Sequence, residues 1–99
     1  MPPASEPDGA TTFAIPEHVL SRSAAGELVI LDLATDEYYG LEDVGARAWQ
    51  LLADGATFSE IVETLLGEYE VEPEVLRRDV ADLLGGLVDA GLVTACPPG

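Results

Sequence analysis

The sequence contains no lysine, and its four basic residues face 19 acidic residues over 99 positions, which gives a formal net charge of −15. Affinity for nucleic acids comes mostly from Lys and Arg side chains that displace counterions from the phosphates. The arginines form no patch either, because the one adjacent pair, Arg77 and Arg78, is surrounded by acidic residues. The composition therefore argues against a partner that is DNA or RNA.

Disulfides and membrane segments are also missing. The single cysteine, Cys96, allows no internal disulfide, and its place in a Pro-rich end predicts a dispensable thiol in a frayed tail. No run approaches the ~20 apolar residues of a membrane span, and the N-terminus lacks the pattern of a signal peptide. We therefore expect a cytoplasmic protein with no membrane partner.

The residues on which enzymes depend are scarce as well. His18 is the only histidine and has no Ser or Cys beside it in sequence, which predicts an exposed polar residue rather than a general base. Asp79 with Asp82 is too sparse for a metal site, and no glycines form a phosphate-binding motif. We expect no catalytic residue, no metal and no cofactor, and therefore a protein that is not an enzyme.

What is present is enough for one folded domain between two short tails. Residues 1–12 are rich in Pro, Ala, Ser and acidic residues and show no periodicity, so they are predicted to be a flexible N-terminal segment. The folded domain is expected over residues 13–94. Residues 95–99 are predicted to be a flexible C-terminal tail.

Three short strands are predicted over His18–Ala24, Glu27–Leu33 and Tyr38–Leu41, separated by turn residues. In the central segment apolar residues occupy both alternating faces, with Leu28 and Ile30 on one of them. Both faces of the resulting β-meander therefore need cover, and helices are expected to supply it on at least one.

Three helices are predicted after the strands. Apolar residues recur at helical spacing over Asp43–Ala53, which predicts the first helix. Thr57 and Glu60 form a capping box at the start of the second helix. The third helix begins at Pro73 and ends before Gly91. The sequence thus predicts an α+β, winged-helix-like fold, in which a three-stranded antiparallel sheet is followed by a three-helix bundle.

The third predicted helix carries two adjacent glycines, Gly85 and Gly86, in its interior. A glycine there costs about 1 kcal/mol relative to alanine. Two interpretations stay open: a kink or tight helix crossing, and a shallow trough that receives a partner.

Five segments keep a distinctive order and spacing: Leu31–Leu33, Tyr38–Leu41, Val44–Leu52, Thr57–Tyr69 and Asp79–Val93. In this arrangement, over about residues 15–94, the chain resembles the PqqD-like family, the peptide-recognition elements of ribosomal peptide biosynthesis. It is most similar to the free-standing leader-binding proteins of lasso-peptide clusters. One departure is Ala48, where the family often has a larger aliphatic residue, which bears on packing.

The resemblance implies that a precursor's leader peptide adds as a further strand beside the third strand and lies over the third helix. The implied partners are this leader peptide, a separate transglutaminase-like leader peptidase and a ring-closing cyclase. The segment Tyr38–Leu41 suits an edge strand, and Gly40 permits another backbone to approach closely. The residues expected to bind the peptide are Tyr38, Tyr39, Gly40, Val75, Leu76, Asp79, Val80 and Leu83.

Within that set, roles follow from alternation along the strand. Leu41 leads into the first helix and should face the core, so Tyr38 is the better candidate for an exposed aromatic contact. Leu76, Val80 and Leu83 are expected to line the groove floor, with Asp79 available to accept a hydrogen bond or to pair with a cation. Plain core packing remains the competing interpretation for each.

Two other functions fit the same pattern. A PqqD-like protein can deliver its peptide to another modifying enzyme, such as a radical SAM enzyme, and a winged-helix adaptor would share the fold without selective affinity for a leader. The acid excess also has two interpretations: a solvated surface, or a surface that docks on a basic patch of the peptidase.

Overall fold

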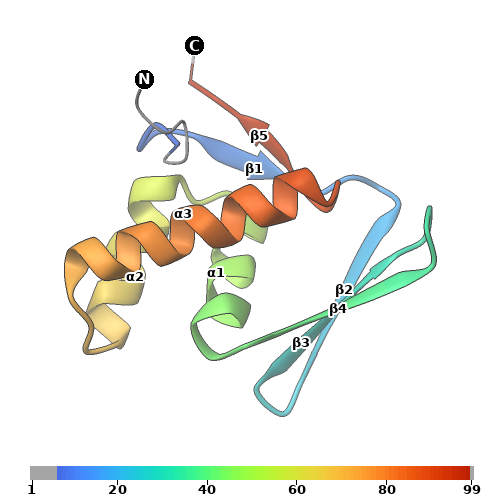
Figure 1. Ribbon diagram of the computed structural model, residues 1–99, viewed down its shortest axis with the longest axis horizontal. Coiled ribbons are helices and arrows are strands. Elements are labelled where there is room, and N and C mark those ends of the chain that lie inside the picture. The colour runs from blue at the N-terminus through green and yellow to red at the C-terminus, as the bar shows by residue number, and fades with distance from the viewer. Residues whose placement is uncertain (1–6, 99) are drawn as a thin grey trace.

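The computed structural model describes residues 7–98, which form an α+β fold of three helices and two separate sheets (Figure 1). The larger sheet has three antiparallel strands in the order β2-β3-β4, and the smaller pairs β1 with β5. The predicted fold class is confirmed. The elements are β1 (Thr12–Ala14), β2 (Val19–Ala24), β3 (Glu27–Asp32), β4 (Glu37–Glu42), α1 (Asp43–Ala53), α2 (Phe58–Glu68), α3 (Pro73–Asp89) and β5 (Thr94–Cys96).

Tight turns set the register of the meander. Ala24 pairs with Glu27 across a two-residue turn in which Ala25 and Gly26 both have positive φ, at 53° and 82°. Turns of this kind match the right-handed twist of the strands that they join. At the other end of β3, the Asp32 carboxylate accepts a hydrogen bond from the Ala34 N–H at 2.9 Å and shapes the turn into β4.

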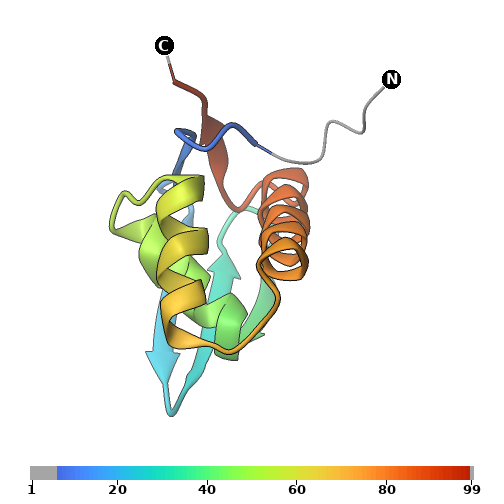
Figure 2. The ribbon, with the colours of Figure 1, turned by 90° about the vertical axis from the view of Figure 1, so that its left-hand side faces the viewer.

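Helices cover only one face of the larger sheet (Figure 2). On the covered face Leu28 and Ile30 are buried, at 3% and 0% exposure. On the opposite face Leu20 and Val29 are about half exposed, at 52% and 47%. The expectation that helices cover at least one face is confirmed, and an apolar face is left open to solvent.

The helices begin and end where the sequence predicts. In the capping box the Thr57 hydroxyl accepts from the Glu60 N–H, and the Glu60 carboxylate accepts from the Thr57 N–H at 2.8 Å. Pro73 lies in the first turn of α3, and Gly91 takes a φ of 76° just beyond its end. Among residues 7–98, no helix combines the length and apolar character needed to cross a bilayer.

The predicted domain boundaries are too narrow. Thr12 pairs with Cys96 in the β1–β5 ribbon, so residues assigned to both tails belong to the fold. Thr11 is 3% exposed, and its carbonyl accepts from the Phe58 N–H at 2.9 Å. Strands of three residues carry almost no periodicity, and these two are joined only by a contact between distant parts of the chain. Residues 1–6 and 99 of the predicted tails lie outside the described residues.

Removal of the capping hydroxyl tests the start of α2. Thr57→Ala is expected to lower the free energy of unfolding by about 1 kcal/mol, because the Glu60 N–H loses its acceptor. Urea denaturation followed by circular dichroism measures the change. Thr57→Ser, which keeps the hydroxyl, is the control; equal losses in both variants would contradict the role of the cap.

Candidate peptide-binding groove

The strand β4 is one edge of the larger sheet and has β3 as its only neighbour in that sheet. A groove of about 580 Å³ runs between this edge and the C-terminal half of α3. The edge backbone and the groove therefore lie together, which is the geometry that strand addition requires. The residues that line the groove are Tyr38, Tyr39, Gly40, Leu41, Asp82, Leu83, Gly86, Leu87, Ala90 and Leu92.

The floor of the groove is apolar. The side chains of Leu41 and Leu83 approach each other beside Gly45, at the start of α1. A Cβ built on Gly45 would lie 3.6 Å from Leu41 Cδ2 and 3.8 Å from Leu83 Cδ2. Leu87 and Leu92 are buried and continue the floor toward the end of α3. An apolar side chain of a bound peptide would lose its water shell against this surface.

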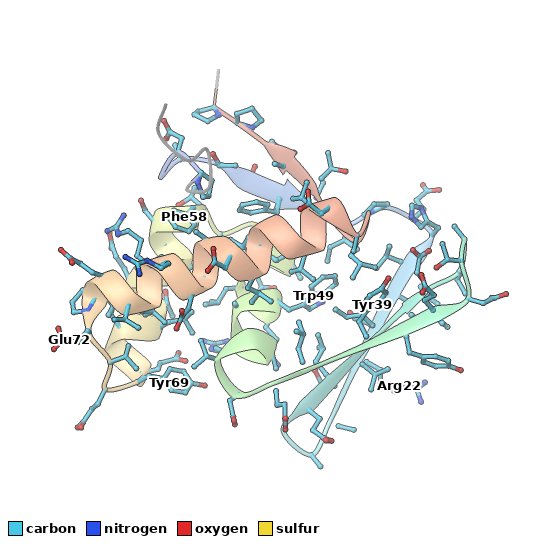
Figure 3. The ribbon with its side chains drawn as sticks, in the orientation of Figure 1. Arg22, Tyr39, Trp49, Phe58, Tyr69 and Glu72 are labelled. Atoms are coloured by element: carbon cyan, nitrogen blue, oxygen red, sulfur yellow. The ribbon has the colours of Figure 1, made fainter. Side chains whose placement is uncertain are left out.

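Tyr39 adds a polar group to the groove wall. Figure 3 shows its side chain on the face of the sheet that looks toward α3. Its hydroxyl donates to Glu37 Oε1 at 3.3 Å. Desolvation, and then the neighbouring Glu37 carboxylate, raise the pKa of Tyr39 above its ordinary value. The phenol therefore stays protonated over the physiological range and keeps its hydrogen bond to Glu37.

A glycine lies in each wall of the groove. A Cβ built on Gly40 in β4 or on Gly86 in α3 would meet no atom within 4 Å outside its immediate surroundings. No close contact within the described part of the chain therefore requires glycine at either position. Gly86 favours the trough interpretation over a tight helix crossing, because no other element of the fold approaches it closely.

Four of the predicted site residues line the groove: Tyr38, Tyr39, Gly40 and Leu83. Leu76 and Val80 were expected to form its floor together with Leu83, and that placement is wrong. They are 3% and 1% exposed, belong to the core cluster, and are not among the residues that line the groove. Their face of α3 packs on the other helices.

Val75 and Asp79 are exposed but lie on the N-terminal half of α3, outside the residues that line the groove. Asp82, about one turn further along, is exposed and lines the groove, where Asp79 was expected to accept a hydrogen bond or to pair with a cation. By helical spacing, Asp79 shares a face of α3 with residues 82, 86 and 90. The helical periodicity of the sequence does not show at which position along α3 the strand β4 crosses it.

The described residues offer little for catalysis or metal binding. They contain no group of three or more His, Cys, Asp or Glu side chains placed to hold a metal ion. The shortest ion pair in this part of the chain joins Arg47 Nη2 to Glu68 Oε2 at 2.9 Å and links α1 to α2. The hydrogen bond from Arg47 lowers the pKa of Glu68, an effect of helix packing.

A family model agrees with this geometry. The model for coenzyme PQQ synthesis protein D (PqqD) matches residues 27–93, from β3 to the end of the bundle. The chain belongs to the PqqD family. The match includes both walls of the groove, β4 and α3, and omits β2 and the β1–β5 ribbon.

Two solved structures are similar to this PqqD-family protein over most of its length. One is TbiB1 in complex with the TbiA(beta) leader peptide, 38% identical, with a TM-score of 0.77 over 81% of this chain and 93% of that one. The other is lasso peptide synthetase B1 complexed with the leader peptide, 30% identical, with a TM-score of 0.77 over 83% and 96%. No curated protein sequence matches the chain.

The separation of groove from core is open to a stability test. Leu76→Ala is expected to lower the free energy of unfolding by about 2–4 kcal/mol, because it leaves a cavity in the core. Tyr38→Thr should change it by less than about 1 kcal/mol, because Tyr38 is 75% exposed and Thr suits a strand. Chemical denaturation of both variants measures the difference, and similar losses would contradict the assignment.

Proposed function

We propose that this protein binds the leader peptide of a ribosomally made precursor, a lasso-peptide precursor in the first instance. The peptide adds as a strand along β4 and is presented to a separate transglutaminase-like leader peptidase and then to a cyclase. The observation that carries the proposal is the open β4 edge beside an apolar groove. It is supported by two similar proteins, each solved with a leader peptide.

Main-chain pairing supplies affinity that depends little on sequence. The outer edge of β4 presents N–H and C=O groups that β3 does not use, and an extended peptide satisfies them. Alternate side chains of the added strand then point to opposite faces of the sheet. One set enters the groove against Leu41 and Leu83, and the other set lies on the uncovered face.

The groove selects the peptide by the side chains that enter it. Its leucine floor favours bulky apolar residues, which gain most from burial. Asp82 at the rim and the protein's net charge favour a leader with a basic residue beside the apolar one. Pairing and burial are short-range interactions, so binding survives moderate salt.

No bond is made or broken in this mechanism. Capture of the leader holds the precursor close to enzymes that need little affinity of their own, because tethering raises the effective concentration of the cleavage site. Delivery to another modifying enzyme uses the same groove. The lasso-peptide assignment is favoured by the similarity to lasso peptide synthetase B1.

Titration of a labelled leader peptide from the accompanying precursor, followed by fluorescence anisotropy, tests the groove. The native protein is expected to bind with a Kd of about 1 μM or tighter, and a scrambled leader should not compete. Gly86→Leu should weaken binding roughly tenfold or more by filling the groove. Gly67→Leu in α2 is the matched control, since a Cβ at either glycine meets no atom within 4 Å. Equal affinity in both variants would contradict the groove.

Hydrogen–deuterium exchange distinguishes the two edges of the sheet. Saturation with leader peptide is expected to slow exchange of the edge amides of β4, because they become donors to the added strand. The amides of β2, the other edge strand, should be unaffected. Protection confined to β2 would move the binding site to the opposite edge.

A further inference from the structure

A second groove lies on the other side of α3 from β4. It has a volume of about 550 Å³ and runs between the C-terminal half of α3 and the β1–β5 ribbon (Figure 1). The PqqD family model matches residues 27–93, so it includes neither strand of this wall. The second groove is therefore built partly by residues outside the family model, and the function proposed above does not use it.

The second groove has an apolar floor. Phe13 pairs with Ala95 in the ribbon, and both residues line the groove together with Leu84 and Val88 of α3. Phe13 and Leu84 are buried, whereas Val88 is 36% exposed. An apolar side chain of a bound molecule would lose its water shell here, as it would in the groove beside β4.

The two grooves meet on the exposed face of α3. Asp82 and Gly86 line both of them, and Gly85 and Asp89 line only the second. These four residues are exposed and follow the spacing i, i+3, i+4, i+7, so they share one face of the helix. A Cβ built on Gly85 or Gly86 would meet no atom within 4 Å. The passage from one groove to the other therefore leads over two residues that have no side chain.

The size of this passage suits an extended peptide. At the usual rise of an α-helix, Asp82 and Asp89 lie about 10 Å apart along the axis, with the two glycines between them. An extended chain advances about 3.3 Å per residue, so about three or four residues cross the width of the helix. A role as a passage also gives a reason for two successive glycines in a helix, each of which costs about 1 kcal/mol relative to alanine.

The charges along the passage describe its occupant. Asp82 and Asp89 are the charged residues that line the second groove, and neither forms an ion pair with another described residue. A Lys or Arg side chain that crosses between them can pair with either carboxylate. A second copy of this chain suits the passage poorly, because it also carries a net charge of −15. The leader peptide, by contrast, lies in the adjoining groove under the proposed function.

We infer that the leader peptide binds in both grooves. One segment adds to β4, and an adjoining flank of the same peptide crosses α3 over Gly85 and Gly86 and places an apolar side chain on the floor of the second groove. A basic residue of the flank lies between Asp82 and Asp89. The inference rests on the proposed function and extends it, since the preferred leader carries a basic and an apolar residue beside its strand segment. Because the two contacts are linked, the second adds affinity through a high effective concentration.

Gly85→Leu tests the second groove alone, because Gly85 does not line the groove beside β4. Leucine has a higher helix propensity than glycine, so the variant is expected to fold. Gly67→Leu in α2 is the matched control, since a Cβ there also meets no atom within 4 Å. Fluorescence anisotropy measures the affinity for the whole leader and for the shortest segment that still binds, which is found by shortening the leader from each end.

The native protein is expected to bind the whole leader about tenfold more tightly than the short segment, because only the whole leader reaches the second groove. Gly85→Leu should abolish this difference and keep the affinity for the short segment within about twofold, whereas Gly67→Leu should change neither affinity. Gly86→Leu should weaken the binding of both peptides, because Gly86 lines both grooves.

The acidic passage has its own matched pair. Asp89→Asn and Glu63→Gln each remove one charge from an exposed residue of a helix. Only Asp89→Asn is expected to weaken binding of the whole leader, by about threefold, and to reduce its dependence on salt. Neither should affect the short segment, because neither residue lines the groove beside β4. An equal effect of both substitutions on the whole leader would overturn the contact with Asp89.

Cys96 allows the flank to be located directly. It is exposed, follows Ala95 in β5 and is the only cysteine of the chain, so a nitroxide can be attached there without a substitution. The nitroxide is expected to broaden the NMR signals of the flank more than those of the segment on β4, because Ala95 lines the second groove. Broadening confined to the segment on β4 would contradict the inferred path.

The remaining outcomes separate this inference from the proposed function. A native protein that binds neither peptide overturns the proposed function and this inference with it. Leader binding that Gly86→Leu weakens and Gly85→Leu does not weaken overturns the second groove alone. If that result comes with a dimer in sedimentation velocity that Gly85→Leu dissociates, the second groove belongs to a second copy. If it comes with slower association of the purified peptidase, the groove belongs to that enzyme.

Discussion

Trp49 lies where α1 meets the larger sheet and joins the two halves of the fold. Its side chain is 1% exposed, and its indole N–H donates to Ser21 Oγ at 3.1 Å, which ties the helix to β2 (Figure 3). Around it the bundle covers Leu28 and Ile30 on one face of the sheet. A three-stranded sheet with a single covered face keeps two edges and one open face, and the groove beside β4 follows from that constraint.

The third helix packs into the core and also borders the groove. Leu76, Val80 and Leu84 are buried in the core, and a neighbouring stripe containing Asp82 and Gly86 borders the groove beside β4. Because α3 is held firmly by its buried stripe, the groove wall is placed by core packing and not by a loop. A peptide that added to β4, as proposed, would meet a largely preformed site, which limits the entropy lost on binding.

The charge of the protein and its open surfaces act together. A net charge of −15 on a small domain opposes association between copies, although the sheet presents an unpaired edge and an apolar face. The same charge favours basic partners over acidic ones. Protection against self-association and selection of partners thus come from the same side chains.

Local patterns in the sequence determined the strands of the larger sheet and the three helices. Alternation specified β2, β3 and β4, and the capping box, Pro73 and Gly91 marked helix ends, because each depends on residues close together in the chain. Alternation also placed Tyr38 outward on an edge strand. The charge balance, which argues against a nucleic-acid partner, likewise needs no coordinates.

Tertiary structure alone decided where distant segments meet. The strands β1 and β5 pair the two ends of the domain. No local pattern in the sequence predicts a pairing between segments so far apart in the chain. The crossing point of β4 on α3 placed Asp82 and Gly86 at the groove and left Leu76 and Val80 in the core. Helical periodicity identifies the faces of a helix, but the position along it that a neighbour contacts depends on the packing of the whole domain.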